Sequence, residues 1–203
     1  MAKITNTGVH IVEGSAAASD TGGEGQIWVK SDTPSSLYYT DDAGTDFRMG
    51  GITLGTKVDS TSGTAIDFTG IPSGVKRIIF CMNDVSTNSN SDYRVQLGDS
   101  GGFETSGYLD SAQTGTTAEL STAAFQLTTS IGSGETWSGQ LTLCLLDSGT
   151  NHWSGSHCFG RGDSGSTTVG AGSKALSGTL TQLRFTTVSG DTFDAGDVNI
   201  SFS

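Results

Sequence analysis

Residues 52–203 alternate between short apolar runs and short turns that are rich in glycine, serine and aspartate. The turns include Thr61-Ser-Gly-Thr64, Pro72-Ser-Gly74 and Ser189-Gly-Asp-Thr192. Apolar runs of this length between turn residues are typical of β-strands. The pattern predicts strands at Ala65–Phe68, Val75–Met82, Tyr93–Leu97, Phe103–Leu109, Ala124–Thr128, Gln140–Asp147, Trp153–Phe159, Leu180–Val188 and Val198–Phe202.

Many short strands joined by tight turns predict an all-β domain, a two-sheet sandwich with a jelly roll as the leading topology. Val75–Met82 and Leu141–Leu146 are nearly continuously apolar and are predicted to be central strands. Leu180–Val188 alternates less cleanly, so we expect it to keep one wet face. Regular helix is nearly absent, because Ala16–Ser19 and the Thr122-Ala-Ala turn are too short to stand alone.

A separate hairpin is predicted near the N-terminus, with strands Gln26–Lys30 and Ser36–Thr40 and a closing Asp-Asp-Ala-Gly turn. One hairpin cannot bury enough apolar surface to be stable alone in water. This one nevertheless carries more large apolar side chains than an exposed ribbon needs, so we expect a copy from another chain to cover them. The expected contact residues are Ile27, Trp28, Val29, Leu37, Tyr38, Tyr39 and Phe47.

The chain divides around Gly50-Gly51. Residues 1–51 hold the leader and the hairpin, which we interpret as an attachment and oligomerisation region. Residues 52–203 form the predicted jelly-roll-like β-sandwich. The whole chain has 203 residues, which is enough for one sizeable domain and a small appendage.

Composition narrows the possible partners. The formal net charge is −11, and the ten basic residues are scattered, which excludes nucleic acid because phosphate recognition needs clustered Lys and Arg. No apolar run approaches the length of a membrane span, and the start of the chain lacks the apolar core of a signal peptide, so we expect synthesis in a cytoplasm and no membrane insertion. No cofactor is predicted.

The three cysteines have no CxxC spacing, and their odd number favours reduced thiols. Cys81 and Cys144 lie in apolar runs and are predicted to be small core residues. Cys158 lies near His152 and His157, but a zinc site would need a fourth ligand and tetrahedral geometry. We therefore predict no metal site there.

Two motifs and the acidic residues of the chain could suggest an enzyme or a binding site, but we interpret them as parts of turns and loops. Gly98-Asp-Ser-Gly-Gly102 copies the nucleophile motif of trypsin-like proteases, but the only upstream histidine is His10, outside the domain. Arg161-Gly-Asp163 spells the integrin-binding tripeptide, and we expect it instead in a long outward-facing loop over Gly160–Gly172. The scattered acidic residues single out no glycosidase pair, and no ordered calcium loop occurs, although calcium binding by loop carboxylates stays open. No enzyme is predicted.

The sequence also carries a resemblance. The stretch from Gly25 to Phe47 resembles a segment that recurs near the N-termini of tail-fibre and other virion proteins of bacteriophages, especially marine phages. The frames Ile66-Asp-Phe-Thr-Gly-Ile-Pro-Ser-Gly and Val95-Gln-Leu-Gly-Asp-Ser-Gly-Gly-Phe-Glu, with the end of the chain from Leu183, resemble C-terminal domains of such fibre-like proteins. The resemblance implies a virion protein, most simply a homotrimeric tail fibre whose N-terminal region docks on another virion protein. The alternative is a capsid decoration or head-fibre protein with a purely structural role.

Adhesion to a host would need a recognition surface. Sugar rings stack on aromatic faces while polar side chains bind their hydroxyl groups. Several aromatic residues lie at predicted strand ends or beside Gly/Ser-rich turns, so we expect them to face a cell-surface glycan or protein. For Trp137 and Trp153 the alternative, packing in the sandwich core, is the favoured interpretation. The expected recognition residues are Tyr93, Tyr108, Trp137, Trp153, Phe159, Arg161 and Asp163.

Overall fold

The computed structural model describes residues 3–5, 8–10, 13–16, 24–31 and 36–203. Within these residues the protein is all-β: it has no helix, and 58% of it is strand. The chain forms two compact units, Met1–Ile52 and Thr53–Ser203, which meet beside the predicted boundary at Gly50-Gly51. The predicted fold class, a β-sandwich preceded by a small β-rich segment, is confirmed.

The described residues of the first unit form six short strands: β1 (Lys3–Thr5), β2 (Gly8–His10), β3 (Glu13–Gly14), β4 (Gln26–Lys30), β5 (Ser36–Thr40) and β6 (Asp46–Arg48). β1 pairs with β2, and the other four form a sheet in the order β3-β4-β5-β6, with β3 parallel to β4. The strands β4 and β5 are the predicted hairpin, with the predicted bounds. The turn that joins them, residues 32–35, lies outside the described residues.

The residues of the turn between β5 and β6 explain why the chain reverses its direction there. The Asp41 carboxylate accepts hydrogen bonds from the backbone N–H groups of Ala43 (3.0 Å) and Thr45 (2.8 Å). Gly44 has a φ of 80°, a conformation that glycine adopts without steric cost. The predicted Asp-Asp-Ala-Gly turn is therefore confirmed, and it adds a third antiparallel strand, β6, to the hairpin.

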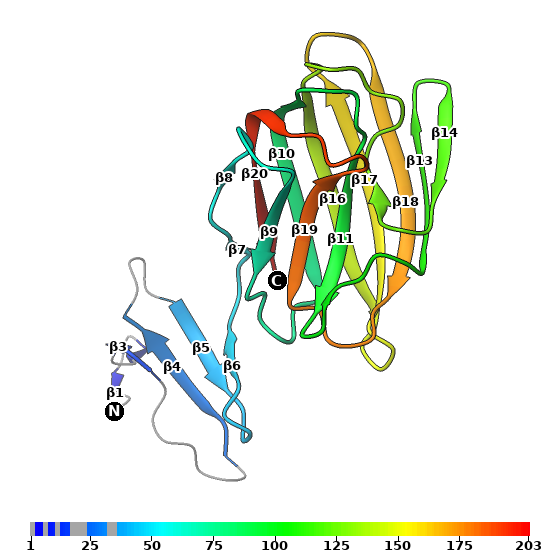
Figure 1. The fold of residues 1–203 in the computed structure, drawn as a ribbon. Coiled ribbons are helices and arrows are strands. Elements are labelled where there is room, and N and C mark those ends of the chain that lie inside the picture. Colours follow the sequence, from blue (N-terminus) through cyan, green and yellow to red (C-terminus); the bar gives the residue numbers. More distant parts are fainter. Residues whose placement is uncertain (1–2, 6–7, 11–12, 17–23, 32–35) are drawn as a thin grey trace. The chain divides into compact units, whose positions relative to one another are not determined.

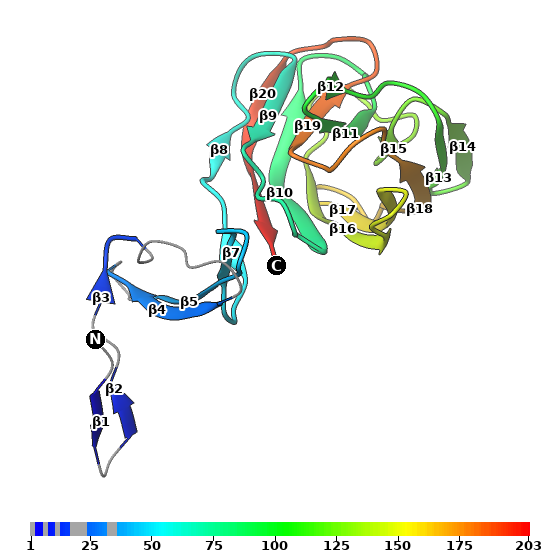
Figure 2. The ribbon, with the colours of Figure 1, turned by 90° about the horizontal axis from the view of Figure 1, so that it is seen from below.

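The second unit is a two-sheet sandwich (Figures 1 and 2). The strands of its large sheet are β7 (Thr53–Leu54), β8 (Val58–Asp59), β10 (Arg77–Thr87), β13 (Tyr108–Thr114), β14 (Thr117–Ser121), β16 (Trp137–Asp147), β17 (His152–Arg161), β18 (Thr167–Ala175) and β20 (Phe193–Phe202). They follow the order β14-β13-β18-β17-β16-β10-β20-β7, and β8 also pairs with β20.

The small sheet lies across the core from the middle of the large one (Figure 2). Its strands are β9 (Ala65–Thr69), β11 (Tyr93–Asp99), β12 (Gly102–Phe103), β15 (Phe125–Gln126) and β19 (Gln182–Thr187). They follow the order β12-β11-β19-β9, with β15 pairing to β11. All pairings in both sheets are antiparallel.

The strand order confirms the sandwich but not the jelly-roll topology. Three consecutive strands, β16, β17 and β18, form a meander within the large sheet. The earlier strand β13 then lies beside β18, and β10 lies beside β16. This is one Greek-key arrangement. The second Greek key that defines a jelly roll is not evident in the order of the small sheet.

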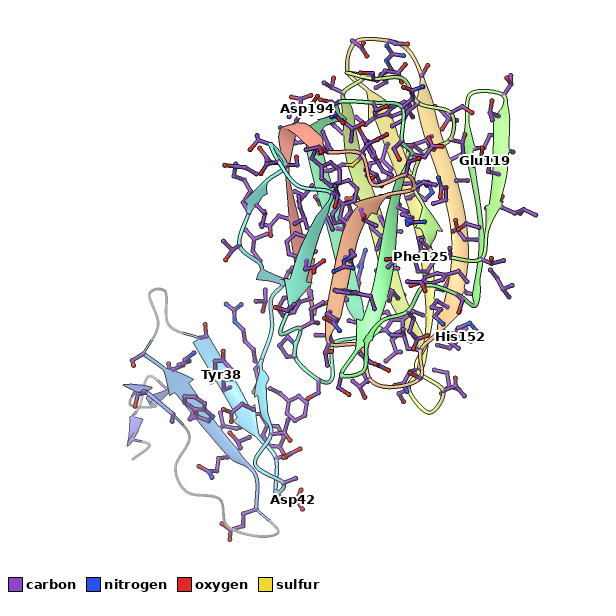
Figure 3. The ribbon with its side chains drawn as sticks, viewed as in Figure 1. Tyr38, Asp42, Glu119, Phe125, His152 and Asp194 are labelled. Atoms are coloured by element: carbon purple, nitrogen blue, oxygen red, sulfur yellow. The ribbon has the colours of Figure 1, made fainter. Side chains whose placement is uncertain are left out.

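A cluster of aromatic and aliphatic side chains fills the space between the sheets. At its centre Phe185 lies with its ring centroid 5.0 Å from that of Phe80 and 4.8 Å from that of Phe193. In another part of the core, Phe125, which is labelled in Figure 3, meets Tyr108 edge-on with ring centroids 5.4 Å apart. These rings come from both sheets, so the core depends on their packing face to face.

Several sequence predictions need correction. The predicted strand Phe103–Leu109 is two strands, β12 and β13, in different sheets. The expected long loop over Gly160–Gly172 is a tight turn followed by β18, whose run of threonine, glycine, alanine and serine has too few large apolar residues to be recognised. The Thr122-Ala-Ala segment is a bend rather than a helical turn. The predicted central positions of β10 and β16 are confirmed.

Candidate functional site

The sheet of the first unit has two chemically different faces. Residues directly opposite each other on paired strands point to the same side of a sheet. Ile27 pairs with Tyr39, Val29 with Leu37, and Tyr39 with Phe47, so these side chains share one face. We call this set the apolar face. Four of its five side chains are exposed, from 38% for Leu37 and Tyr39 to 57% for Ile27, and Val29 is half-buried.

Trp28 and Tyr38 occupy the opposite face. Their rings stack with centroids 4.9 Å apart, and Trp28 is only 9% exposed. The indole Nε1 of Trp28 donates a hydrogen bond to the hydroxyl of Thr40 at 2.9 Å, and that hydroxyl donates to Asp46 at 2.5 Å. The predicted attachment residues are therefore divided: five form the apolar face, while Trp28 and Tyr38 stabilise the sheet from its other side.

Replacing Trp28 with alanine should destabilise the first unit by about 3 kcal/mol, because it removes a large buried ring and the stacking contact of that ring with Tyr38. Hydrogen exchange of the β4 and β5 amides in dilute, monomeric protein would measure the change. Ile27→Ala is the matched control, since that neighbouring side chain is largely exposed and its loss should leave protection unchanged. Equal loss of protection in both variants would contradict the division of the two faces.

The predicted recognition aromatics of the sandwich do not face solvent, and this corrects the sequence interpretation. None of the five is more than 2% exposed, and all belong to the core: Tyr93, Tyr108, Trp137, Trp153 and Phe159. The alternative of core packing for both tryptophans is confirmed. The prediction failed because aromatic residues at strand ends look the same in sequence whether they turn toward the core or toward solvent.

The two buried tyrosines are held by backbone hydrogen bonds. The Tyr108 hydroxyl accepts from the Leu97 N–H at 2.7 Å and donates to the Glu104 carbonyl at 3.1 Å. The Tyr93 hydroxyl donates to the Val85 carbonyl at 3.2 Å. Burial raises the pKa of both phenols above the usual value. They are thus structural members of the sandwich and offer no ring face to a ligand.

The remaining predicted recognition residues lie where β17 ends: Arg161 is the last residue of the strand, and Asp163 lies in the turn that leads to β18. The Arg161 guanidinium donates to both Asp163 oxygens, at 2.5 and 2.8 Å, and to Glu135 at 2.6 Å. Hydrogen bonding to Arg161 lowers the pKa of the Asp163 carboxyl. The Asp163 side chain is 51% exposed. Arg161 is mostly engaged within the molecule, and Asp163 is the more available of the two.

The other motifs form ordinary structural turns. Gly98 pairs with Phe103 in the short β11–β12 hairpin, so the protease-like motif is a tight turn. The Asp99 carboxylate accepts hydrogen bonds from the Gly101 N–H and the Ser177 hydroxyl, both at 2.7 Å, which lowers its pKa. Among the described residues no three histidine, cysteine or acidic side chains gather as a metal site. The described part of the chain also contains no helix long and apolar enough to cross a membrane.

The cysteines correct a further expectation. Cys81, Cys144 and Cys158 are free and exposed on the outer surface of the large sheet, and the first two are not core residues. Alternation along each strand explains this, because their neighbours Phe80, Met82, Leu141 and Leu143 point inward. An apolar run can therefore contain an outward-facing thiol.

Sequence reasoning missed a buried polar pair, Asp110 on β13 and His157 on β17. They are only 5% and 6% exposed. Both side chains point inward, and their strands lie on either side of β18. The two side chains occupy space that is free because β18 has glycine at positions 170 and 172. A Cβ on Gly170 would lie 2.2 Å from the His157 imidazole, and a Cβ on Gly172 would lie 2.5 Å from the Asp110 carboxylate. The Gly-Ala-Gly spacing of β18 was the only available sequence signal.

This pair is incompletely satisfied by hydrogen bonds. One Asp110 oxygen accepts from the Gln126 N–H at 2.8 Å, while its other oxygen and both His157 ring nitrogens have no partner. Burial raises the pKa of Asp110 to about 6 and lowers the pKa of His157 to about 4. Both shifts have the same physical cause, because removal from water disfavours the charged form of each group.

Comparison with known proteins finds no matching family model, no matching curated protein and no matching solved structure. The structure itself shows a two-sheet β-sandwich and a small N-terminal sheet with one apolar face.

Proposed function

We propose that the chain is a structural protein of a bacteriophage virion, and that copies of it associate, as a homotrimer, through the apolar face of the N-terminal sheet. The observation that carries the proposal is the exposure of that face. A sheet of four short strands gains little stability by itself, and exposed contiguous apolar surface commonly marks an interaction site. Association would remove these side chains from water.

The phage assignment is supported by the resemblance of the segment from Gly25 to Phe47 to virion fibre proteins. In the described structure this segment is the β4–β5 hairpin extended by β6. Under the proposal, the first unit attaches the sandwich to another virion protein, and the assembled protein resides in the virion.

Tail-fibre adhesion to a host glycan or protein is one form of the proposal. The turn that carries Arg161 and Asp163 supports it, because half-exposed carboxylates can accept hydrogen bonds from sugar hydroxyls. Repetition of such a weak site in a trimer would raise the avidity. The second form is capsid decoration without receptor binding. It is favoured by one specific observation: the aromatic side chains of residues 53–203 are buried except for the half-buried Phe103 and Phe202, so the sandwich offers little of the usual stacking platform for sugars.

Leu37→Glu tests the assembly proposal. We expect wild-type protein to be oligomeric at micromolar concentration and the variant to dissociate at least about tenfold more readily, since burying a carboxylate in an apolar contact costs well over 1.4 kcal/mol. Sedimentation or light scattering would measure this. Val188→Glu, at a similarly exposed apolar site in the sandwich, is the control and should not change the mass. A monomeric wild type would refute the proposal.

The position in the particle needs a separate experiment. Antibody raised against the sandwich, labelled with gold and applied to intact virions, would distinguish the two forms. Label at the tail supports adhesion, and binding of host envelope polysaccharide should then weaken in Asp163→Asn. Label spread over the head supports decoration. No label on virions would contradict a virion function altogether.

A further inference from the structure

The large sheet turns a broad uncharged surface toward solvent. Its outward residues line up in rows across β10, β16, β17, β18, β13 and β14, because the strands pair in continuous register. From β16 to β14 the central row and the rows beside it contain no charged side chain. We call this surface the outer face. Its central row is Ile79, Thr142, Ser156, Ala171, Ser111 and Leu120.

The outer face also carries projecting apolar side chains next to a hollow. Leu120 is 86% exposed and Leu109 is 75% exposed. The two leucines border a shallow hollow of about 340 Å³, whose lining also includes the smaller residues Ser111, Thr122 and Ala171. One face thus combines leucines that protrude with a recess of small side chains that can receive a leucine. A surface with both features can be complementary to itself, as an isologous contact requires.

Charge and area favour a second copy as the occupant. Each chain has a net charge of −11, so most contacts between copies bring acidic groups together. Apart from Arg77 on β10, which pairs with Cys144, the central row of the outer face and the rows beside it carry no charged side chain, so two copies can meet with at most this one charge per copy near the contact. Six strands about 4.8 Å apart, over about seven residues of about 3.4 Å each, cover roughly 700 Å². This approaches the ~800 Å² that each partner contributes to a standard interface.

We propose that the outer face packs against the outer face of a second copy of this chain. The contact lies entirely within the sandwich and is distinct from the apolar face of the N-terminal sheet, so it goes beyond the function proposed above. In this arrangement Leu120 of each copy enters the hollow of the other. The contact also covers Cys81, Cys144 and Cys158, which lie in the rows on either side of the central one.

The three thiols report directly on this contact. They are exposed in the single chain, so a maleimide should label each of them freely unless a second copy covers them. In the full-length wild-type protein at micromolar concentration we expect labelling at least tenfold slower than in Leu120→Glu, measured for each cysteine by peptide mass spectrometry. Each thiol is compared with itself, so differences in intrinsic reactivity cancel. Val188→Glu is the control and should label like the wild type.

Equal labelling rates in the wild type and in Leu120→Glu would overturn the inference. The Leu37→Glu variant separates it from the proposed function. If Leu37→Glu reduces the mass while the thiols remain protected, both contacts exist. If wild-type protein is oligomeric but its thiols react freely, the N-terminal contact stands and the outer-face contact is refuted. Because Leu120 is almost fully exposed in the single chain, its replacement by glutamate should not unfold the sandwich.

Discussion

Replacing Phe185 with alanine should lower the free energy of unfolding of the sandwich by about 3–5 kcal/mol, the usual cost of truncating a fully buried phenylalanine. Phe185 is fully buried on β19, and its ring contacts aromatic rings from both sheets: Phe80 at 5.0 Å, Tyr93 at 5.7 Å and Phe193 at 4.8 Å. Its loss therefore leaves a cavity between the two layers, where the surrounding rings cannot close without moving their strands.

Urea denaturation, followed by the fluorescence of the buried tryptophans, would measure the change. Phe47→Ala is the matched control, because that phenylalanine is 40% exposed and belongs to the other unit. We expect the sandwich transition of this control to coincide with that of the wild type. A loss below about 1 kcal/mol for Phe185→Ala would show that the two sheets do not depend on the aromatic cluster for their packing.

Asp110→Asn should raise the stability of the sandwich at pH 7 by about 2–3 kcal/mol. The folded pKa of Asp110 is about 6, above the ordinary value of 3.8, because burial disfavours its charge. Between those two values the folded state holds more protons than the unfolded state. The free energy of unfolding is therefore highest at low pH, where Asp110 is protonated in both states, and it falls as the pH rises from about 3.8 through 6. Asparagine has the same shape and never ionises, so it removes this loss.

His157 acts in the opposite direction. Its folded pKa of about 4 lies below the ordinary 6.5, so the unfolded state binds more protons between these values. The stability associated with neutral His157 is present above pH 6.5 and is lost as the pH falls toward 4. In the wild type the contributions of Asp110 and His157 to the slope nearly cancel between pH 4 and 6.

Replacing one of the two residues at a time should reveal the dependence of stability on pH that the other residue causes. In Asp110→Asn, stability should fall as the pH decreases from 6.5 to 4, whereas in His157→Gln it should fall as the pH increases from 4 to 6. Denaturation midpoints at several pH values would measure both. Ser111→Ala changes an exposed neighbour of Asp110 and serves as the control, so its stability should depend on pH as that of the wild type does. Parallel profiles in all four proteins would contradict the burial of the pair.

Local patterns predicted the strands where large apolar residues mark them. Phe80 and Met82 identify β10, and the apolar run around Trp28 identifies β4 with its observed bounds. The same patterns missed β18, whose residues are small because Asp110 and His157 lie over its inner side. They also mistook Tyr93 and Tyr108 for surface residues, because a side chain at a strand end gives no local sign of which layer it enters.

The sequence by itself determined that the chain is all-β, that it consists of a hairpin-bearing segment and a sandwich, and that its turns lie at Gly/Ser/Asp clusters. These properties depend on contacts between near neighbours in the chain, and those are legible in residue order. Only the tertiary structure decided which side of each sheet is buried. It separated Trp28 from the apolar face, placed the aromatic rings in the core, and turned Cys81, Cys144 and Cys158 outward. Whether a side chain points toward the core or toward solvent depends on which strands pair and which sheets stack. Those partners lie far apart in the sequence.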